Sequence, residues 1–236
     1  MVQMFLPHAV QLRLLVEDSP RIVCGCIGRR ILSVLLFYFP LRSVLPVKAL
    51  EDKIINEGRV YPGNILKVSS FLNQQLDCAF LMEMGKEIAR LYKDDGVTKI
   101  ITIEASGIAI AVAAGAAMGI PAVFAKKSKA ANLSDNVYSG RVHSYTHGTD
   151  YTVRIDKENI LSSDRLLIVD DFLATGNAIA GLLEIAEQAG ASVAGAAIAI
   201  EKCFQHGGDR YRREGLRIES LAKISEMSEN GLTFVR

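Results

Sequence analysis

The 236-residue chain contains no tryptophan, only four cysteines and almost no net charge, at +1. Four cysteines are too few for a disulfide-stabilised scaffold, and a composition that is 50% hydrophobic excludes a disordered or collagen-like chain. The sequence also lacks an unbroken apolar run of about 20 residues, which a membrane-spanning helix requires. Its long uncharged stretch, residues 105–125, is rich in alanine and glycine and contains Pro121. We therefore expect a globular α/β protein with no membrane partner.

The near-zero net charge conceals two regions of different composition. Residues 1–48 contain six basic and two acidic side chains, whereas residues 49–236 contain 21 basic and 24 acidic ones. A mildly acidic bulk argues against a nucleic-acid-binding surface, because such surfaces neutralise phosphates with Lys and Arg. We therefore predict no nucleic-acid partner.

Residues 1–48 also lack the periodic apolar pattern of the rest, and we predict that they form an N-terminal extension. Three interpretations remain open: a membrane anchor, a targeting peptide, or upstream sequence translated from a misassigned start. The apolar stretch 31–41 is too short to cross a bilayer, and no small-x-small cleavage site follows it. We favour the third interpretation because globular patterning begins at Ala49, and we expect one domain over residues 49–236.

From residue 77 onward, the pattern predicts helices that alternate with short apolar strands. The predicted helices cover about 77–96, 108–118 and 177–189, and the predicted strands cover 99–103, 122–125, 166–169 and 193–200. This alternation is typical of a parallel twisted sheet flanked by helices. Ligands of such sheets bind beyond the carboxyl ends of the strands, so the loops 104–107, 170–177 and 201–204 are the candidate site.

Residues 126–162 have a different character from the segments on either side. They begin with three lysines and continue with Ser, Thr, Asn, Tyr and His, and the alternation around Gly148 predicts a polar hairpin. A polar insertion of this length in a compact domain is commonly a functional lid. His143 and His147 have the spacing of metal ligands but lack a third ligand, so we predict no metal site there.

The segment 169–177, with the sequence VDDFLATGN, is the most informative part of the chain. An apolar strand is predicted to end in Asp170 and Asp171, followed by a small-residue loop that opens a helix. Backbone N–H groups at that helix start, with the Thr175 hydroxyl and the close approach that Gly176 permits, predict an anion site. Two carboxylates would repel a phosphate unless they face hydroxyls, such as the vicinal diol of a ribose, or support a Mg²⁺ shell. The predicted ligand is therefore a ribose 5-phosphate.

Other phosphate-binding folds are excluded by missing motifs. The chain has neither the G-x-x-x-x-G-K-[ST] run of P-loop proteins nor the G-x-G-x-x-G run of dinucleotide-binding folds. A capped helix that follows two solvated aspartates remains an alternative interpretation. It does not explain why two adjacent acids and a Thr-Gly pair stand at the end of a strand.

The run DDFLATG at 170–176 resembles the 5-phosphoribosyl 1-pyrophosphate (PRPP) motif of type I phosphoribosyltransferases. Further segments resemble the xanthine-specific members of that family over about residues 49–235: ALEDKI at 49–54, LKV at 66–68, SFLN at 70–73, TIEASGIA at 102–109 and IEKCFQ at 200–205. The resemblance implies the type I phosphoribosyltransferase fold, with a small hood from the N-terminal and inserted segments.

The resemblance also implies an activity and its site. The expected reaction is purine salvage, in which xanthine and PRPP become xanthosine 5'-monophosphate and pyrophosphate, in a cytoplasmic homodimer that binds Mg²⁺ mainly through the substrate. By the same resemblance, the 5-phosphate is held by Ala174, Thr175, Gly176, Asn177 and Ala178, the pyrophosphate by Glu104, Ala105, Ser106 and Gly107, and the xanthine by Leu66, Asn73 and Lys202. Asp170 and Asp171 would lie under the ribose hydroxyls as catalytic residues.

Two groups of lysines can be assigned a role from the chemistry. Lys202 follows a predicted strand at the edge of the sheet, where its ammonium could donate to an exocyclic oxygen of an oxo-purine but would be repelled by the amino group of adenine. The departing pyrophosphate develops negative charge while the ribose becomes positive, so Lys126, Lys127 or Lys129, together with Mg²⁺, is a candidate for stabilising it.

One position departs from the relatives that use hypoxanthine and guanine. Those relatives have an aspartate where this chain has Ala174, which cannot perform acid–base chemistry. We therefore expect the base to react already deprotonated, favoured by the positive charge of Lys202. Two alternative functions remain open, namely a hypoxanthine–guanine phosphoribosyltransferase and a PRPP-sensing regulator that binds nucleic acid.

Overall fold

The computed structural model describes residues 46–127, 136–144, 149–229 and 231–236. Nearly all of the predicted N-terminal extension lies outside these ranges, as do Lys129, His147 and the predicted turn at Gly148. The first described helix, α2 (Pro46–Glu57), begins three residues before Ala49.

The core of the fold is a six-stranded sheet with the order β10-β9-β8-β7-β3-β4. Its strands are β3 (Lys99–Ile103), β4 (Ala122–Ala125), β7 (Arg165–Leu173), β8 (Ser192–Lys202), β9 (Ile218–Ser228) and β10 (Gly231–Phe234). Every neighbouring pair is parallel except β9 and β10, which are antiparallel. The predicted parallel sheet is confirmed, and the two C-terminal strands extend it.

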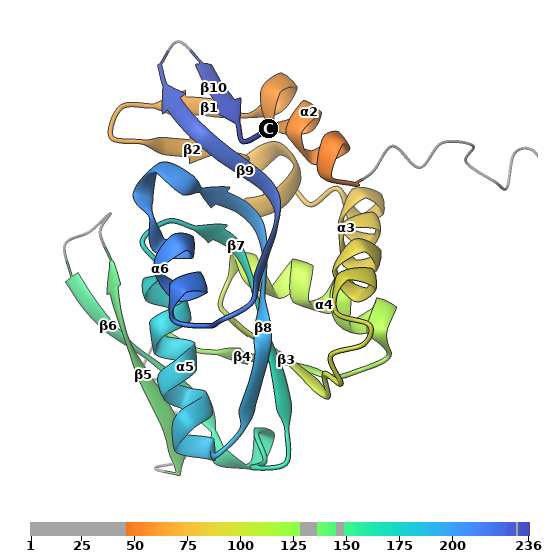
Figure 1. Cartoon of the computed structure of the whole chain (residues 1–236), viewed down its shortest axis with the longest axis vertical. Coiled ribbons are helices and arrows are strands. Elements are labelled where there is room, and N and C mark those ends of the chain that lie inside the picture. Colours follow the sequence, from red (N-terminus) through yellow and green to blue (C-terminus); the bar gives the residue numbers. More distant parts are fainter. Residues whose placement is uncertain (1–45, 128–135, 145–148, 230) are drawn as a thin grey trace, which may run out of the picture. The chain divides into compact units, whose positions relative to one another are not determined.

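Helices cover both faces of this sheet, as Figure 1 shows. One core cluster joins α3 (Cys78–Leu91) and α4 (Ser106–Met118) to one face, and a second joins α5 (Asn177–Ala189) to the other. The β7 side chains alternate between them, because Leu167 and Val169 lie in the first cluster and Leu166 and Ile168 in the second. This two-sided burial explains why the strand reads as a continuous apolar run.

Several predicted element boundaries are wrong by a few residues. β7 continues through Leu173, so Asp170 and Asp171 lie inside the strand rather than after it. β8 likewise includes Lys202, and α4 begins at Ser106 rather than Ile108. The cause is tertiary pairing: β7 keeps bonding to β8 through the register Leu173↔Glu201, beyond the end of the apolar run.

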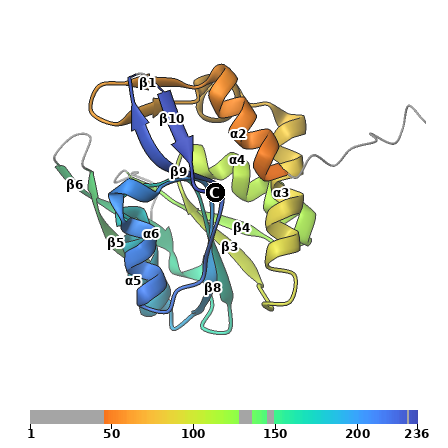
Figure 2. The same ribbon diagram turned by 45° about the horizontal axis from the view of Figure 1, so that its top comes forward.

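Two smaller antiparallel sheets flank the central one (Figure 2). The strands β1 (Arg59–Tyr61) and β2 (Ile65–Lys67) form the hood with α2 and a π-helical turn, η1 (Ser69–Asn73), and α2 and β1 pack against β9. The inserted segment forms the predicted hairpin, β5 (Val137–Ser144) and β6 (Thr149–Asp156), followed by the 3₁₀ turn η2 (Lys157–Asn159). The hairpin packs along α5 with a close backbone contact, since a Cβ on Gly140 would lie 2.0 Å from the carbonyl oxygen of Gly181.

Within the described ranges, none of the helices has the length and apolar character needed to cross a membrane.

Candidate active site

A cavity of about 820 Å³ opens at the carboxyl ends of β7 and β8. Its wall combines four segments: the β1–β2 turn at residues 63–66, hairpin residues Val142, His143 and Tyr151, the run 170–179, and Lys202 with Gln205 beyond it. The sheet edge predicted to bind the ligand is therefore the edge that carries the cavity. Both the hood and the inserted hairpin overhang it.

Both members of the acidic pair, Asp170 and Asp171, line this cavity. The backbone N–H of Asp171 donates to Oδ1 of Asp170 at 3.0 Å, and the Asn73 amide donates to Oδ2 of Asp171 at 3.1 Å. Burial, followed by the negative charge of Asp171, raises the pKa of the Asp170 carboxyl well above its ordinary value. Asn73, expected to contact the base, is bonded to Asp171 and is not among the residues that line the cavity.

The predicted 5-phosphate loop lies directly beside the acids. Residues 174–178 all line the cavity and lead into the first turn of α5, whose opening backbone N–H groups have no partner within the helix. Gly176 has a φ of +85°, a left-handed conformation that glycine adopts without strain. Asn177 donates from its side chain to the His143 carbonyl at 2.8 Å, which ties the hairpin to the helix start. The arrangement suits a bound anion.

The segment 104–107 adjoins the cavity without lining it. A Cβ on Gly107 would lie 3.3 Å from Oδ1 of Asp170 and 2.0 Å from the Thr102 hydroxyl, so the start of α4 lies against the acidic pair. The Glu104 carboxylate accepts a hydrogen bond from the backbone N–H of Lys127 at 2.7 Å, and the peptide bond between Glu104 and Ala105 is cis. Ser106 and Gly107 belong to the first helical turn rather than to a loop.

Lys126 and Lys127, the two described candidates for stabilising the pyrophosphate, lie in different places. The Lys127 ammonium lies 5.4 Å from the ring centre of Tyr151, which is part of the cavity wall. Lys126 lines a separate hollow of about 280 Å³ beside Arg154, with which it exchanges backbone hydrogen bonds of 2.9 and 3.0 Å. The structure therefore brings Lys127 to the cavity and Lys126 away from it.

Lys202 lines the cavity at the end of β8. Its ammonium donates to the carbonyl of Asn64 at 2.8 Å and lies 5.3 Å from the ring centre of Phe172. Burial lowers the pKa of Lys202, and the negative charge of Asp171 offsets part of this effect. Leu66, also predicted to contact the base, lines the same end of the cavity.

Sequence reasoning assigned no binding role to several residues of this wall, among them Asn64, Tyr151, Phe172 and Gln205. Phe172 belongs to the DDFLATG motif and Gln205 to the IEKCFQ motif. Because these motifs also contain the acidic pair and Lys202, the two residues could have been predicted to lie near the site. Asn64 and Tyr151 come from the hood turn and the hairpin, and no motif marks them. The Gln205 side-chain oxygen is buried and has no hydrogen-bond partner among the described residues.

A family model described as the phosphoribosyl transferase domain matches residues 72–219 of the chain. This match includes the acidic pair, the loop after it, the segment 104–107 and Lys202. The chain therefore belongs to the phosphoribosyltransferase family.

More closely related proteins define its group within that family. The chain is 48% identical over 190 residues to the xanthine phosphoribosyltransferase of Bacillus cereus strain AH187, and this match covers 80% of the chain and 96% of the relative. The relative of the same name from Bacillus anthracis gives the same identity and coverage. By this similarity the chain is a member of the xanthine phosphoribosyltransferases.

Solved structures agree on the fold. The adenine phosphoribosyltransferase of Giardia lamblia, solved with 9-deazaadenine, superposes with a TM-score of 0.61 at 21% identity and covers 73% of this chain and 96% of its own. Because the identity is low, this likeness supports the fold alone.

We predict that Asp170→Asn stabilises the protein at neutral pH. A carboxyl whose pKa is raised by folding penalises the folded state once the pH exceeds its unfolded value of 3.8. Asparagine keeps the acceptor for the Asp171 N–H but carries no charge, so we expect thermal unfolding roughly 2–5 °C higher at pH 7. The difference should disappear below pH 3.8, where the carboxyl is protonated in both states.

Asp94→Asn is the matched control, because the Asp94 side chain is 86% exposed. Calorimetry of both variants and the parent between pH 3 and pH 7 measures the unfolding temperatures. If Asp170→Asn unfolds at pH 7 at the same temperature as the parent, or at a lower one, the prediction is wrong.

Proposed function

We propose that the chain catalyses purine salvage by transferring the phosphoribosyl group of PRPP to xanthine, forming xanthosine 5'-monophosphate and pyrophosphate. The observation that carries this proposal is one cavity of about 820 Å³ that is lined by the acidic pair, by the small-residue loop that leads into α5 and by Lys202. The 48% identity to xanthine phosphoribosyltransferases supports the choice of base.

The acidic pair and the loop after it would hold the ribose 5-phosphate. Carboxylates accept hydrogen bonds from two vicinal hydroxyls, so Asp170 and Asp171 would bind the ribose diol. The 5-phosphate would lie on residues 174–178, where backbone N–H groups and the dipole of α5 favour an anion.

Lys202 and Leu66 would bind the purine. The Lys202 ammonium has three N–H donors and uses one on Asn64, so others can reach an exocyclic oxygen of the base. Leu66 contributes apolar surface at the same end of the cavity. Asn73 would act on the ribose side through its bond to Asp171.

The pyrophosphate would lie against residues 104–107 and Lys127. Negative charge grows on the leaving group as the bond to C1 of the ribose breaks, and positive charge grows on the sugar. Backbone N–H groups and an ammonium already in place stabilise that charge without reorganisation. Lys127 is better placed than Lys126, because it lies over a residue of the cavity wall.

Mg²⁺ would enter with the donor substrate. Among the residues that the structure describes, no group of three or more His, Cys, Asp or Glu side chains could hold a metal ion. The cavity offers a pair of carboxylates next to two phosphate-binding segments, which fits an ion carried mainly by the substrate phosphates. When bound, Mg²⁺ would neutralise charge on the departing pyrophosphate.

The base would react as an anion. Its N9 attacks C1 of the ribose as pyrophosphate leaves, and Ala174 cannot remove a proton from it. The positive charge of Lys202 favours the deprotonated base on Coulombic grounds. Closure of the hairpin side of the cavity would keep water from capturing the reactive sugar.

We further propose a cytoplasmic homodimer. The two described cysteines, Cys78 and Cys203, are free thiols, as expected in a reducing compartment. The helix α4 contains no charged side chain, yet its Val112 is 58% exposed, and Phe124 of the neighbouring edge strand β4 is 40% exposed. Exposed apolar groups on one edge of the sheet favour association with a second copy.

The decisive experiment incubates the full chain with PRPP, Mg²⁺ and, separately, xanthine, hypoxanthine, guanine and adenine, while nucleotide and pyrophosphate are quantified. Xanthine should give the highest kcat/KM. A higher value for hypoxanthine or guanine would overturn the proposed base specificity. PRPP binding without transfer to any base would favour a sensing regulator.

We predict that kcat/KM for xanthine first rises with pH as the base ionises. At higher pH it should fall as Lys202 loses its proton, and the midpoint of that fall should lie below 10.5, the ordinary pKa of lysine. The sign follows from burial, which lowers the pKa of Lys202 and therefore brings its deprotonation to lower pH. Lys202→Met should reduce kcat/KM by about tenfold or more and remove the falling limb. Lys93→Met, whose parent side chain is 69% exposed, is the control. A profile that stays flat while xanthine ionises would refute the reaction of an anionic base.

We predict that Val112→Glu converts a dimer into monomers, because a charge buried at an apolar interface loses its hydration. Size-exclusion chromatography with light scattering measures the mass. Ile55→Glu, at a residue of α2 that is 57% exposed, should leave the dimer intact. A monomeric parent protein, or a dimeric Val112→Glu, would disprove this interface.

A further inference from the structure

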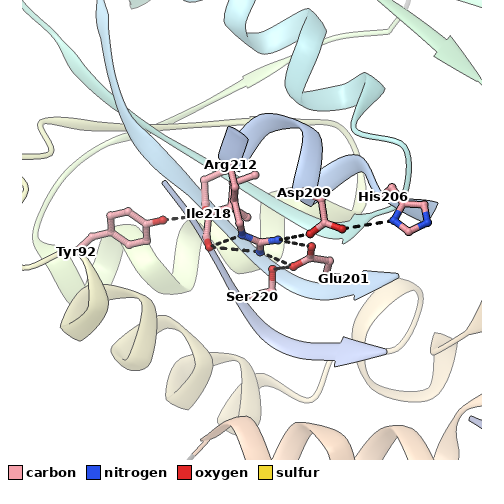
Figure 3. A network of polar contacts seen from close by, with 8 residues as sticks. Tyr92, Glu201, His206, Asp209, Arg212, Ile218 and Ser220 are labelled. Carbon is pink, nitrogen blue, oxygen red and sulfur yellow. Dashed lines mark hydrogen bonds and ion pairs between the residues drawn. The ribbon is translucent and has the colours of Figure 1, made fainter. Parts of the chain in front are cut away.

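The carboxylate of Glu201 is buried behind the cavity and is held there by Arg212 of the short helix α6 (Gly207–Arg213), as Figure 3 shows. Glu201 is 1% exposed, and its two oxygens accept hydrogen bonds from Arg212 at 2.7 and 2.6 Å. Ser220 of β9 donates another at 2.5 Å. Burial alone would raise the pKa of Glu201, but the bonds from Arg212 and Ser220 hold it below its ordinary value. Because a buried charge is tolerated only when it is paired, this ion pair fixes α6 to the end of β8.

The α6 backbone also touches the loop that precedes α5. A Cβ on Gly208 would lie 1.9 Å from a carboxylate oxygen of Glu201, and a Cβ on Gly207 would lie 2.3 Å from the carbonyl oxygen of Ala174. The Gly207 N–H donates to that same carbonyl at 3.1 Å. The helix is thus wedged between the ion pair and the proposed 5-phosphate loop.

Tyr211 makes a second contact from α6 to this loop. Its hydroxyl donates to the carbonyl of Gly176 at 3.1 Å, and the side chain is 3% exposed. A Cβ on Gly176 would lie 2.5 Å from a ring carbon of Tyr211, so the ring fills the space beside that glycine. Gly176, in the middle of the loop, is therefore supported by a side chain that does not line the cavity.

We propose that α6 is a positioning element, locked by the Glu201–Arg212 ion pair, that sets the 5-phosphate loop in register with Lys202. Glu201 directly precedes Lys202 in β8, so the ion pair orients the strand end that carries Lys202. The same ion pair holds α6, which contacts the 5-phosphate loop through Gly207 and Tyr211. In the described part of the chain, Glu201, Arg212 and Tyr211 do not line the cavity, so they act through the groups that do. This inference rests on the proposed binding of PRPP.

Tyr211→Phe is the sharpest test, because it removes one hydroxyl and keeps the ring. Tyr92→Phe is the matched control: Tyr92 is fully buried and its hydroxyl donates to the Ala196 carbonyl at 2.8 Å, away from the cavity wall. We expect both variants to lose thermal stability. Tyr211→Phe alone should weaken PRPP binding in calorimetry with Mg²⁺ and raise KM for PRPP by about three- to tenfold, with KM for xanthine unchanged.

Arg212→Lys and Arg212→Met test the ion pair itself. Lysine keeps the charge but not the two parallel bonds, so its KM for PRPP should lie between those of the parent and Arg212→Met. Arg90→Met, at a side chain that is 63% exposed and paired with Glu87, should leave KM unchanged. If Arg212→Met does not fold, Arg212→Lys and Tyr211→Phe still decide the question.

The proposal is overturned if Tyr211→Phe and Arg212→Lys lose stability but bind PRPP as the parent does, since the contacts would then be merely structural. Calorimetry with PRPP needs no purine. A wrong choice of xanthine would therefore leave this test intact, whereas absence of PRPP binding by the parent protein would refute the proposed function itself.

Discussion

The parallel pairing of β7 with β8 places the charged groups of the cavity. Its register aligns Asp170 with Ile198 and Leu173 with Glu201, so the acidic pair and Lys202 reach the same edge of the sheet. The register is held by burial on both faces, because neighbouring β7 residues pack alternately into two apolar clusters. A slip by one residue would exchange the faces of every side chain in the strand, which these clusters do not permit.

This scaffold lets the cavity hold electrostatically unfavourable groups. Burial and a like charge raise the pKa of Asp170, and burial lowers the pKa of Lys202. Each group therefore favours its neutral form more than it would in water, and a polyanionic substrate with an attached cation would shift that balance.

Close backbone contacts set the shape of the phosphate loop. Gly207 and Gly208 bring α6 against the loop on one side and against Glu201 on the other, at separations that a side chain would prevent. Tyr211 then fills the space beside Gly176. Small residues in this region thus allow α6 to pack closely against the loop.

Local patterns in the sequence were sufficient for most helices and strands between residues 77 and 202, apart from their exact ends. The helix cap at Asp77 and the span 177–189 follow from periodicity and capping, and the DDFLATG run combines acids, small residues and a helix start. Other features required the tertiary structure: the continuation of β7 and β8 through Leu173 and Lys202, the bond from Asn73 to Asp171, and the separation of Lys127 from Lys126. Patterns reveal what a segment can do by itself, whereas strand ends, side-chain partners and the surroundings of a charge depend on residues distant in the chain.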